Sequence, residues 1–201
     1  MGSFWDRVSG FYDWAESLNR QAYQGIIRET VRWISPGSRV LDCAAGTGGL
    51  SLAAAKKADY VLSTDLSAAM LAQARKKALK SRVEKIAFAR RDLFSPPPER
   101  LFDAVIAGNV LHLLDQPEHA VKCLTACVHP GGRVILPTFL QGEASPSVQF
   151  LLEAYRVLGF RPKHRYTLKS YEAMLRGAFP GYLELTRIPG RLPAGFGVLI
   201  V

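Results

Sequence analysis

Short apolar runs alternate with helical patterns along most of this chain. Turn residues bound each apolar run, and the segments between the runs repeat apolar positions every three or four residues, as an amphipathic helix does. The runs that we predict as strands are residues 39–44, 60–65, 85–90, 102–107, 133–139, 182–188 and 196–201. Because strands that alternate with helices are typical of βαβ units, we expect an α/β fold around a mostly parallel sheet.

Capping and turn residues predict where the helices begin and end. Ser67 is the expected N-cap of one helix, and Pro117 suits the first turn of another. Residues 130–132, Pro-Gly-Gly, predict a turn before the fifth strand. The connection 189–193 between the last two strands is short enough for an antiparallel hairpin. A helical region covers 4–33, helices after the first, second and fourth strands end near 57, 79 and 128, and two later helices cover 147–159 and 168–178.

Composition places the chain among globular proteins. Its 201 residues, 48% hydrophobic and 21% charged, suffice to bury a core without disulfides or metals. Stretches free of charged residues are shorter than the roughly 20 residues that a membrane-spanning helix needs. The first residues lack a basic segment followed by an apolar one, and three cysteines in such a chain favour a reducing compartment. We therefore expect a cytoplasmic, single-domain protein without a membrane span.

The clearest chemical feature is the glycine-rich turn after the first predicted strand. Residues 40–50 read Val-Leu-Asp-Cys-Ala-Ala-Gly-Thr-Gly-Gly-Leu, and such a turn lets the backbone approach a ligand closely. The N-terminus of the following helix offers N–H groups to electron-rich ligand atoms. Asp65 follows Gly46 by 19 residues, which suits a carboxylate that accepts hydrogen bonds from both hydroxyls of a ribose. These residues predict a cofactor that contains a nucleoside.

Two kinds of nucleoside cofactor remain open on this pattern. As a dinucleotide fingerprint, Gly46-x-Gly48-x-x-Ser51 has serine where close helix packing prefers glycine or alanine. The carboxylate of Asp42, inside the strand, would repel a pyrophosphate but suits a cationic cofactor. S-adenosylmethionine carries an ammonium and a sulfonium and has no phosphate. We therefore predict S-adenosylmethionine, with a dinucleotide-binding oxidoreductase of the NAD type as the alternative.

The sequence resembles class I S-adenosylmethionine-dependent methyltransferases in several segments that occur in the right order. Asp-x-Ala-x-Gly-Thr-Gly at 42–48 is similar to their motif I, and Asp65-Leu66-Ser67 with Met70-Leu71 is similar to their ribose-binding segment. Arg91-Asp92-Leu93 resembles the segment beside the adenine, and residues 102–112 and 130–133 resemble the fourth strand with its loop and the turn before the fifth. The resemblance implies that the cofactor is held by Asp42, Ala44, Gly46, Gly48, Asp65, Leu66, Met70, Asp92, Leu93 and Asn109.

The resemblance also implies a fold and a division of the chain. The fold is a Rossmann-like three-layer αβα sandwich, with an N-terminal helical lid and a seven-stranded, mostly parallel sheet whose antiparallel last strand lies beside the fifth. Residues 5–13 are similar to the ubiquinone and menaquinone C-methyltransferase subgroup, which implies that Tyr12 closes over the methionine end of the cofactor. The expected parts are a helical cap (1–35), a cofactor-binding core (36–140), a lid or substrate segment (141–167), and the last helix with the C-terminal hairpin (168–201).

Methyl transfer needs the nucleophile held in line with the methyl group, and a base only where the nucleophile must lose a proton. No Asn/Asp-Pro-Pro-aromatic run follows the fourth strand, where Asn109-Val110-Leu111-His112 stands instead, so we expect an oxygen, carbon or other centre of a small molecule as acceptor. His112 is the candidate base, or else a structural histidine below the cofactor. His164 and Tyr166 are catalytic candidates from a lid, or else part of a surface loop. His119, Cys123 and Cys127 share one helix, but no fourth ligand is evident and we expect no metal.

Charge leaves further functions open. Lysine and arginine number 26 against 17 aspartate and glutamate, a net charge of +9. Between Arg75 and Arg91 the basic residues face only Glu84, so this stretch is either a solvated helix face with its loop or a surface for an anionic partner. We expect the former, with weak and nonspecific RNA binding. An RNA methyltransferase and a catalytically silent methyltransferase-fold binding protein are the remaining alternatives.

Overall fold

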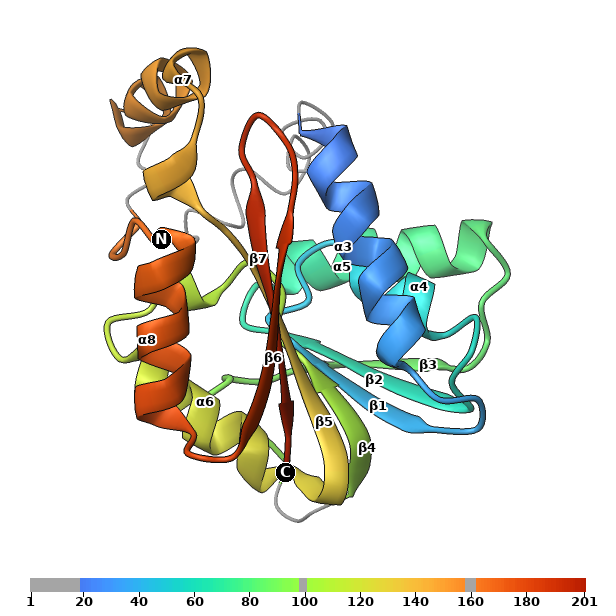
Figure 1. Ribbon diagram of the computed structural model, residues 1–201. Helices are drawn as coiled ribbons and strands as arrows, with labels where there is room; N and C mark the ends of the chain where they lie inside the picture. Colours follow the sequence, from blue (N-terminus) through green and yellow to red (C-terminus); the bar gives the residue numbers. More distant parts are fainter. Residues whose placement is uncertain (1–18, 98–100, 158–161) are drawn as a thin grey trace.

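The computed structural model describes residues 19–97, 101–157 and 162–201 (Figure 1). Its centre is a seven-stranded sheet in the order β3-β2-β1-β4-β5-β7-β6. The strands are β1 (Arg39–Cys43), β2 (Tyr60–Asp65), β3 (Ile86–Arg90), β4 (Phe102–Ile106), β5 (Val128–Phe139), β6 (Tyr182–Ile188) and β7 (Ala194–Ile200). The pairs β1·β2, β1·β4, β2·β3 and β4·β5 are parallel, whereas β7 is antiparallel to both β5 and β6. The expected α/β sheet, with an antiparallel last strand beside the fifth, is confirmed.

Helices cover both faces of the sheet and complete the three layers. They are α3 (Arg20–Trp33), α4 (Gly49–Ala54), α5 (Ala68–Lys80), α6 (Pro117–Ala126), α7 (Pro146–Val157) and α8 (Leu168–Ala178), with short 3₁₀ turns η1 (Leu111–Leu113) and η2 (Gln141–Glu143). Figure 1 shows α6 and α8 on one face and α3, α4 and α5 on the other. None of the helices in the described ranges is long and apolar enough to cross a bilayer.

Alternating side chains of the central strands fill two apolar clusters. In β1, Leu41 belongs to the cluster under α6 and α8, and its neighbour Val40 belongs to the cluster under α3 and α4. Val105 and Ile106 of β4 divide between the clusters in the same way. Successive residues of a strand point to opposite faces, so a strand covered on both sides must be apolar throughout. The carboxyl ends of these strands are therefore held rigidly by core packing.

Most predicted helix boundaries agree with the structure because local capping sets them. Ser67 caps α5 and accepts a hydrogen bond from the Met70 amide at 3.1 Å. Pro117 begins α6, and Thr167 forms a capping box with Ser170 at the start of α8. The helix that follows β1 is shorter than predicted. We expected it to end near Lys57, but α4 ends at Ala54 and residues 55–57 form turns.

The prediction for the start of the fifth strand was wrong by several residues. We expected a turn at 130–132 and a strand from Arg133. In the structure β5 already begins at Val128, and the Pro-Gly-Gly sequence lies within the strand. The register with β4 shifts between Phe102 and Ala104, so residues 129–132 bulge from the ladder. Gly131 adopts a φ of +84° there, and its amide donates to the carbonyl of Val201 at 2.6 Å. Glycine allows a positive φ in a bulge as well as in a turn, so the Pro-Gly-Gly sequence alone does not distinguish the two.

Helix α3 is tied to the hairpin that ends the sheet. The Asn19 side chain, at the N-cap position of α3, donates to the Leu192 carbonyl at 2.7 Å. Further along the helix, Gly25 packs so closely on Ile188 of β6 that a side chain at position 25 would meet the isoleucine methyl. The second strand of the hairpin begins two residues earlier than predicted: β7 starts at Ala194, which pairs with Phe139, and not at Phe196. These contacts fix α3 against β6 and the loop of the hairpin.

Candidate functional site

A strained loop follows β1 at the carboxyl edge of the sheet. Ala44, Gly46 and Gly48 have φ values of 53°, 56° and 81°, in the left-handed region that favours glycine. At Gly48 a side chain would also lie 2.8 Å from the Cβ of Ala74 in α5, so glycine is required there twice over. The Ala45 amide donates to the Thr64 carbonyl at 2.9 Å. The loop is therefore an irregular segment that specific bonds hold in place.

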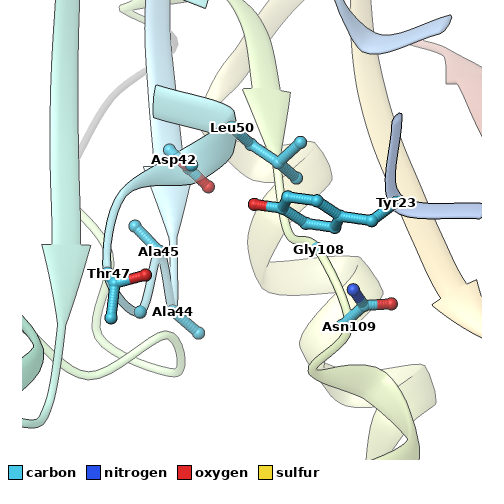
Figure 2. A pocket seen from close by; sticks show the side chains of 10 residues that line it. Tyr23, Asp42, Ala44, Ala45, Thr47, Leu50, Gly108 and Asn109 are labelled. Carbon is cyan, nitrogen blue, oxygen red and sulfur yellow. The ribbon is translucent and has the colours of Figure 1, made fainter. Parts of the chain in front are cut away.

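A cavity of about 350 Å³, counting the space open to solvent, lies beside this loop. Of the predicted cofactor residues, the structure places Asp42, Ala44, Gly46 and Asn109 in its wall. Ala45, Thr47, Gly49, Leu50 and Gly108, which complete the lining with Tyr23, belong to the segments that carry the family resemblance or the glycine-rich turn, whereas no sequence pattern pointed to Tyr23. Figure 2 shows the Tyr23 ring extending from α3 into the space between Asp42 and Asn109.

Asp42 is a carboxylate inside the protein with one oxygen unsatisfied. It is 1% exposed, and its Oδ2 accepts a hydrogen bond from the Ser51 hydroxyl at 2.5 Å. Its Oδ1 has no hydrogen-bond partner. Burial raises the pKa of the Asp42 carboxyl to about 7, and the nearby charge of Asp65 acts in the same direction. A cation in the cavity would reverse this effect and favour the ionised carboxylate.

Asn109, which lines the same cavity, carries a second unsatisfied oxygen. Its backbone is left-handed, with a φ of 53°, and its amide donates to the Pro137 carbonyl at 2.8 Å. The side-chain Oδ1 of Asn109 is buried and has no hydrogen-bond partner. Leaving a buried acceptor unpaired costs about 1–3 kcal/mol. Two such acceptors in one cavity wall favour a ligand that carries hydrogen-bond donors.

Asp65 holds the backbone on both sides of it. Its Oδ2 accepts from the Gly46 amide at 2.8 Å, and its Oδ1 accepts from the Ser67 amide at 2.8 Å. The carboxylate thus joins the end of β2 to the glycine loop and to the start of α5. The predicted bonds to a ribose would come in addition to this structural role.

The other predicted cofactor residues lie outside the cavity wall. Leu66 is 57% exposed at the end of β2, and Asp92 is exposed with its Oδ1 accepting from the Phe94 amide. Met70, at 2% exposure, and Leu93 belong to the packed interior. The structure therefore does not bring Met70 to the cavity, because the first turn of α5 points it into the core. Tyr12 lies outside the described residues.

The three catalytic candidates lie together, with His112 and Tyr166 buried and His164 partly exposed. The backbone amides of Lys163 and His164 donate to the His112 carbonyl at 2.9 and 3.1 Å, so the segment before α8 packs over η1. The His164 ring stacks on Tyr166 with centroids 5.5 Å apart, and its Nε2 donates to the Leu114 carbonyl. Tyr166 is buried, whereas Lys163 and Arg165 are exposed, so this segment is a loop at the surface with the Tyr166 side chain packed inward. None of the three lines the cavity.

Burial sets the protonation states in this cluster. The His112 Nδ1 lies 3.2 Å from the Thr138 hydroxyl, and burial lowers the pKa of the imidazole to about 4, with the charge of His164 acting the same way. His112 is therefore neutral near pH 7. Burial raises the pKa of the Tyr166 phenol to about 12, and the phenol oxygen has no hydrogen-bond partner.

The cysteine and histidine row on α6 does not form a metal centre in the described ranges, where no three His, Cys, Asp or Glu residues lie close enough to hold an ion. The Cys127 thiol points to the Cys123 carbonyl at 3.3 Å, and the His119 ring packs on Phe94. Burial raises the pKa of Cys127 to about 11, so it is a thiol at neutral pH. The row packs against the segment that follows β3.

The chain is similar in sequence to known methyltransferases. Residues 40–132 match the family model described as a methyltransferase domain. A demethylmenaquinone methyltransferase of Clavibacter sepedonicus is 31% identical over 159 residues, 77% of this chain and 62% of the relative. A ubiquinone/menaquinone biosynthesis C-methyltransferase of Cellvibrio japonicus is 29% identical over 133 residues, 64% of this chain and 52% of the relative. The chain thus spans less than two thirds of the length of these curated relatives.

Solved structures show the same fold at low identity. A chain from a Haloferax volcanii complex of the Trm112 methyltransferase activator with a methyltransferase has a TM-score of 0.74 at 15% identity, over 98% of this chain and 96% of that chain. Haemonchus contortus phosphoethanolamine N-methyltransferase 2, solved with S-adenosylhomocysteine, has a TM-score of 0.68 at 16% identity, over 89% of this chain and 52% of that one. These similarities extend over the sheet and both helical layers.

Proposed function

We propose that this chain, whose residues 40–132 match the model of a methyltransferase domain, is a class I enzyme that transfers a methyl group from S-adenosylmethionine to an oxygen, carbon or other centre of a small-molecule acceptor. The observation that carries the proposal is that two residues of one cavity wall, Asp42 and Asn109, each carry a buried oxygen without a hydrogen-bond partner. The ammonium of S-adenosylmethionine offers the donors and the positive charge that these oxygens lack. A pyrophosphate in the same place would face the Asp42 carboxylate, which argues against an NAD-type ligand.

Each part of the site has a role in holding the cofactor. Asp42 and Asn109 accept hydrogen bonds from the ammonium, and the bare backbone at Gly46 allows close approach. Asp65 accepts the ribose hydroxyls, and Leu66, Asp92 and Leu93 lie at the ends of β2 and β3 on the adenosine side. When bound, S-adenosylmethionine supplies an electrophilic methyl group on its sulfonium.

The chain's own contribution to the reaction is orientation and the exclusion of water. The Tyr23 ring and the Leu50 side chain cover one side of the cavity, with the Tyr23 hydroxyl against Gly49 at the start of α4, and we expect them to keep water from the reacting atoms and to hold an acceptor in line. His112, His164 and Tyr166 lie next to the end of β4, on the acceptor side. Because His112 is neutral with a low pKa, it accepts a proton only from an acidic acceptor. A variant His112→Asn with undiminished turnover would exclude His112 as the base.

The comparisons favour a small acceptor. The curated relatives are named for menaquinone and ubiquinone biosynthesis, and one solved neighbour is named for phosphoethanolamine.

We propose that the protein works in the cytoplasm, in keeping with three free thiols of which two are buried.

Binding of S-adenosylhomocysteine, the product of the cofactor, tests the proposal directly. At 100 times its dissociation constant, a ligand that binds only the folded state stabilises it by about 2.7 kcal/mol. We expect a clear rise in melting temperature and a calorimetric binding isotherm with S-adenosylhomocysteine, and neither with NAD. No response to millimolar S-adenosylhomocysteine would overturn the assignment. Transfer of labelled methyl from S-adenosylmethionine to a metabolite panel, against RNA and against no acceptor, then separates an active enzyme from a silent binding protein.

A further inference from the structure

Lys77 differs from the other basic residues of the 75–91 stretch in where its ammonium lies. Lys76 and Lys80, its neighbours on α5, are exposed, whereas Lys77 is half-buried. Its Nζ donates a hydrogen bond to the Thr47 hydroxyl at 2.8 Å. Thr47 is 2% exposed and stands between Gly46 and Gly48 in the loop that lines the cavity. One member of a stretch that the sequence presents as a solvated face therefore reaches the candidate site.

The loop depends on such contacts because its own backbone gives it little regular structure. Left-handed residues alternate through it at positions 44, 46 and 48, so it has no helical or strand ladder to stabilise it. Bonds from other elements fix it instead, at Ala45 from β2, at Gly46 from Asp65, and at Thr47 from Lys77. The bond at Thr47 is a side-chain anchor that comes from α5.

We propose that Lys77 is a positioning residue for the cofactor, which holds the glycine loop in its binding conformation through Thr47. The identity of the ligand rests on the proposed function. A lysine suits this role because a compact ammonium on a flexible stem can reach a single hydroxyl, whereas an arginine presents a planar fork. Loss of the bond between Lys77 and Thr47 leaves the loop with more conformations, and only a fraction of the molecules then hold it in the conformation that binds ligand. The apparent affinity equals the intrinsic affinity multiplied by that fraction, so it falls as the fraction falls.

A purely electrostatic role predicts the opposite sign. If Lys77 acted through its charge alone, its removal would strengthen binding of the cationic S-adenosylmethionine relative to that of S-adenosylhomocysteine, which lacks the sulfonium, and changing Thr47 would have no such effect. A purely structural role predicts a lower melting temperature with unchanged ligand affinity. The positioning role predicts that Lys77 and Thr47 act as a unit, so the two changes weaken binding by the same path.

The test uses the full chain with the variants Lys77→Met, Thr47→Val, the double variant, and Lys76→Met as the matched control from the exposed face. Calorimetric titration with S-adenosylhomocysteine measures affinity, and amide hydrogen exchange of the ligand-free protein measures order in residues 43–50. We expect each single variant to weaken binding about tenfold, the size of one hydrogen bond from a charged group. The double variant should be no weaker than the singles, and Lys76→Met should match the wild type. Exchange at Ala45, Gly46 and Gly48 should be faster in both single variants.

Several results would overturn the inference. They are unchanged affinity and exchange in Lys77→Met, tighter binding in Lys77→Met, or losses that simply add in the double variant. Should the wild type bind no S-adenosylhomocysteine, the proposed function fails. The exchange measurement still decides whether Lys77 orders the loop, because it needs no ligand.

Discussion

Asp42 combines burial, a raised pKa and an unpaired oxygen in the wall of the cavity. In the unfolded chain this carboxyl ionises near its ordinary pKa of 3.8, and in the folded protein it keeps its proton to about pH 7. Between these values the folded state binds one more proton, so the stability of the ligand-free protein falls as pH rises through this window and then levels off. A residue that destabilises the free protein and fits a cationic ligand has a functional reason to be there.

Replacing Asp42 with asparagine should separate stability from binding. Asp42→Asn removes the cost of a buried charge, so the ligand-free protein should be more stable at pH 8, by up to about 4 kcal/mol. Affinity for S-adenosylhomocysteine should fall about 10- to 100-fold, because a hydrogen bond to a charged group is lost. Denaturant melts at pH 5 and 8 with calorimetric titration measure both. A variant that is less stable at pH 8 and binds as well as the wild type would contradict this account.

Asp65 should behave differently, because it has a structural task as well. Asp65→Ala removes the bonds to the Gly46 and Ser67 amides together with any bonds to ribose. We expect a loss of about 2–4 kcal/mol in cofactor affinity and a further loss of about 1–2 kcal/mol in stability. Titration and a denaturant melt on the same sample measure the two effects. Unchanged affinity beside a lowered melt would leave Asp65 with the structural task alone.

At the residue scale, what the sequence could predict depended on spacing. Motif I and the distance to Asp65 place residues of one strand–turn–helix unit, so Asp42 and Gly46 were found from their neighbours. Tyr23 and Lys77 reach the loop from helices packed on it, and no local spacing links them to the glycines. Tyr23 comes from a helix before the first strand, and Lys77 comes from a helix that the sequence shows only as basic. Such residues become visible only when the packing of α3 and α5 is known.

At the scale of elements, capped helices were predicted well and the bulged strand was not. The N-caps at Ser67 and Thr167 act within one turn of helix, so the chain near them contains the whole cause. The start of β5 depends instead on long-range partners. The His129 Nε2 lies 2.7 Å from the Asp103 Oδ1 of β4. The Gly131 amide donates to the carbonyl of Val201, which is seventy positions further along the sequence. Those partners stabilise a bulge where local sequence favours a turn.

The close packing of α3 on the hairpin gives a test at this scale. A Cβ at Gly25 would come within 2.5 Å of the Ile188 methyl, whereas Gly177 in α8 has open space around it. Alanine normally stabilises a helix relative to glycine by up to about 1 kcal/mol. We expect Gly177→Ala to stabilise by roughly that amount and Gly25→Ala to destabilise by about 1–3 kcal/mol. Chemical denaturation of both variants measures this.

A second substitution identifies the cause of the Gly25→Ala effect. Ile188→Ala removes the methyl that the new side chain would meet, so the double variant should be more stable than the two separate losses predict. If the losses simply add, the close approach of α3 to β6 is not the reason for glycine at position 25.

At the scale of the molecule, the chain order of strands and helices predicted a mostly parallel α/β sheet, and the family resemblance predicted the place of its last strand. Apolar runs in alternation with helices permit few topologies, and the resemblance of residues 36–140 to one family selected among them. The packing of residues 162–167, where we propose the acceptor side, could not be predicted in the same way. This segment folds back over η1, a contact between positions about fifty residues apart. Neither periodicity nor a motif encodes that contact.

The net charge of +9 is a property of the whole molecule, and its clearest concentration lies on α5 and β3. The structure engages several of these side chains within the protein. Lys77 bonds to Thr47, the Arg90 guanidinium donates to the Leu66 carbonyl, and Lys85 pairs with Asp59 at 2.9 Å. The Lys85 charge is thus paired, and the head groups of Lys77 and Arg90 are held by bonds within the protein, which argues against a dedicated RNA surface.

We accordingly expect RNA to bind weakly and without sequence preference. Each phosphate contact releases counterions, so even weak binding should fall as salt rises, with a slope that reports the number of contacts. Fluorescence anisotropy with structured and single-stranded RNA, from 50 to 200 mM salt, measures affinity and slope. Reversing Lys76, Lys80 and Arg82, which leaves Lys77 and the loop intact, should change S-adenosylhomocysteine affinity little. Sub-micromolar RNA affinity at physiological salt that this reversal abolishes would instead make RNA the acceptor to test first.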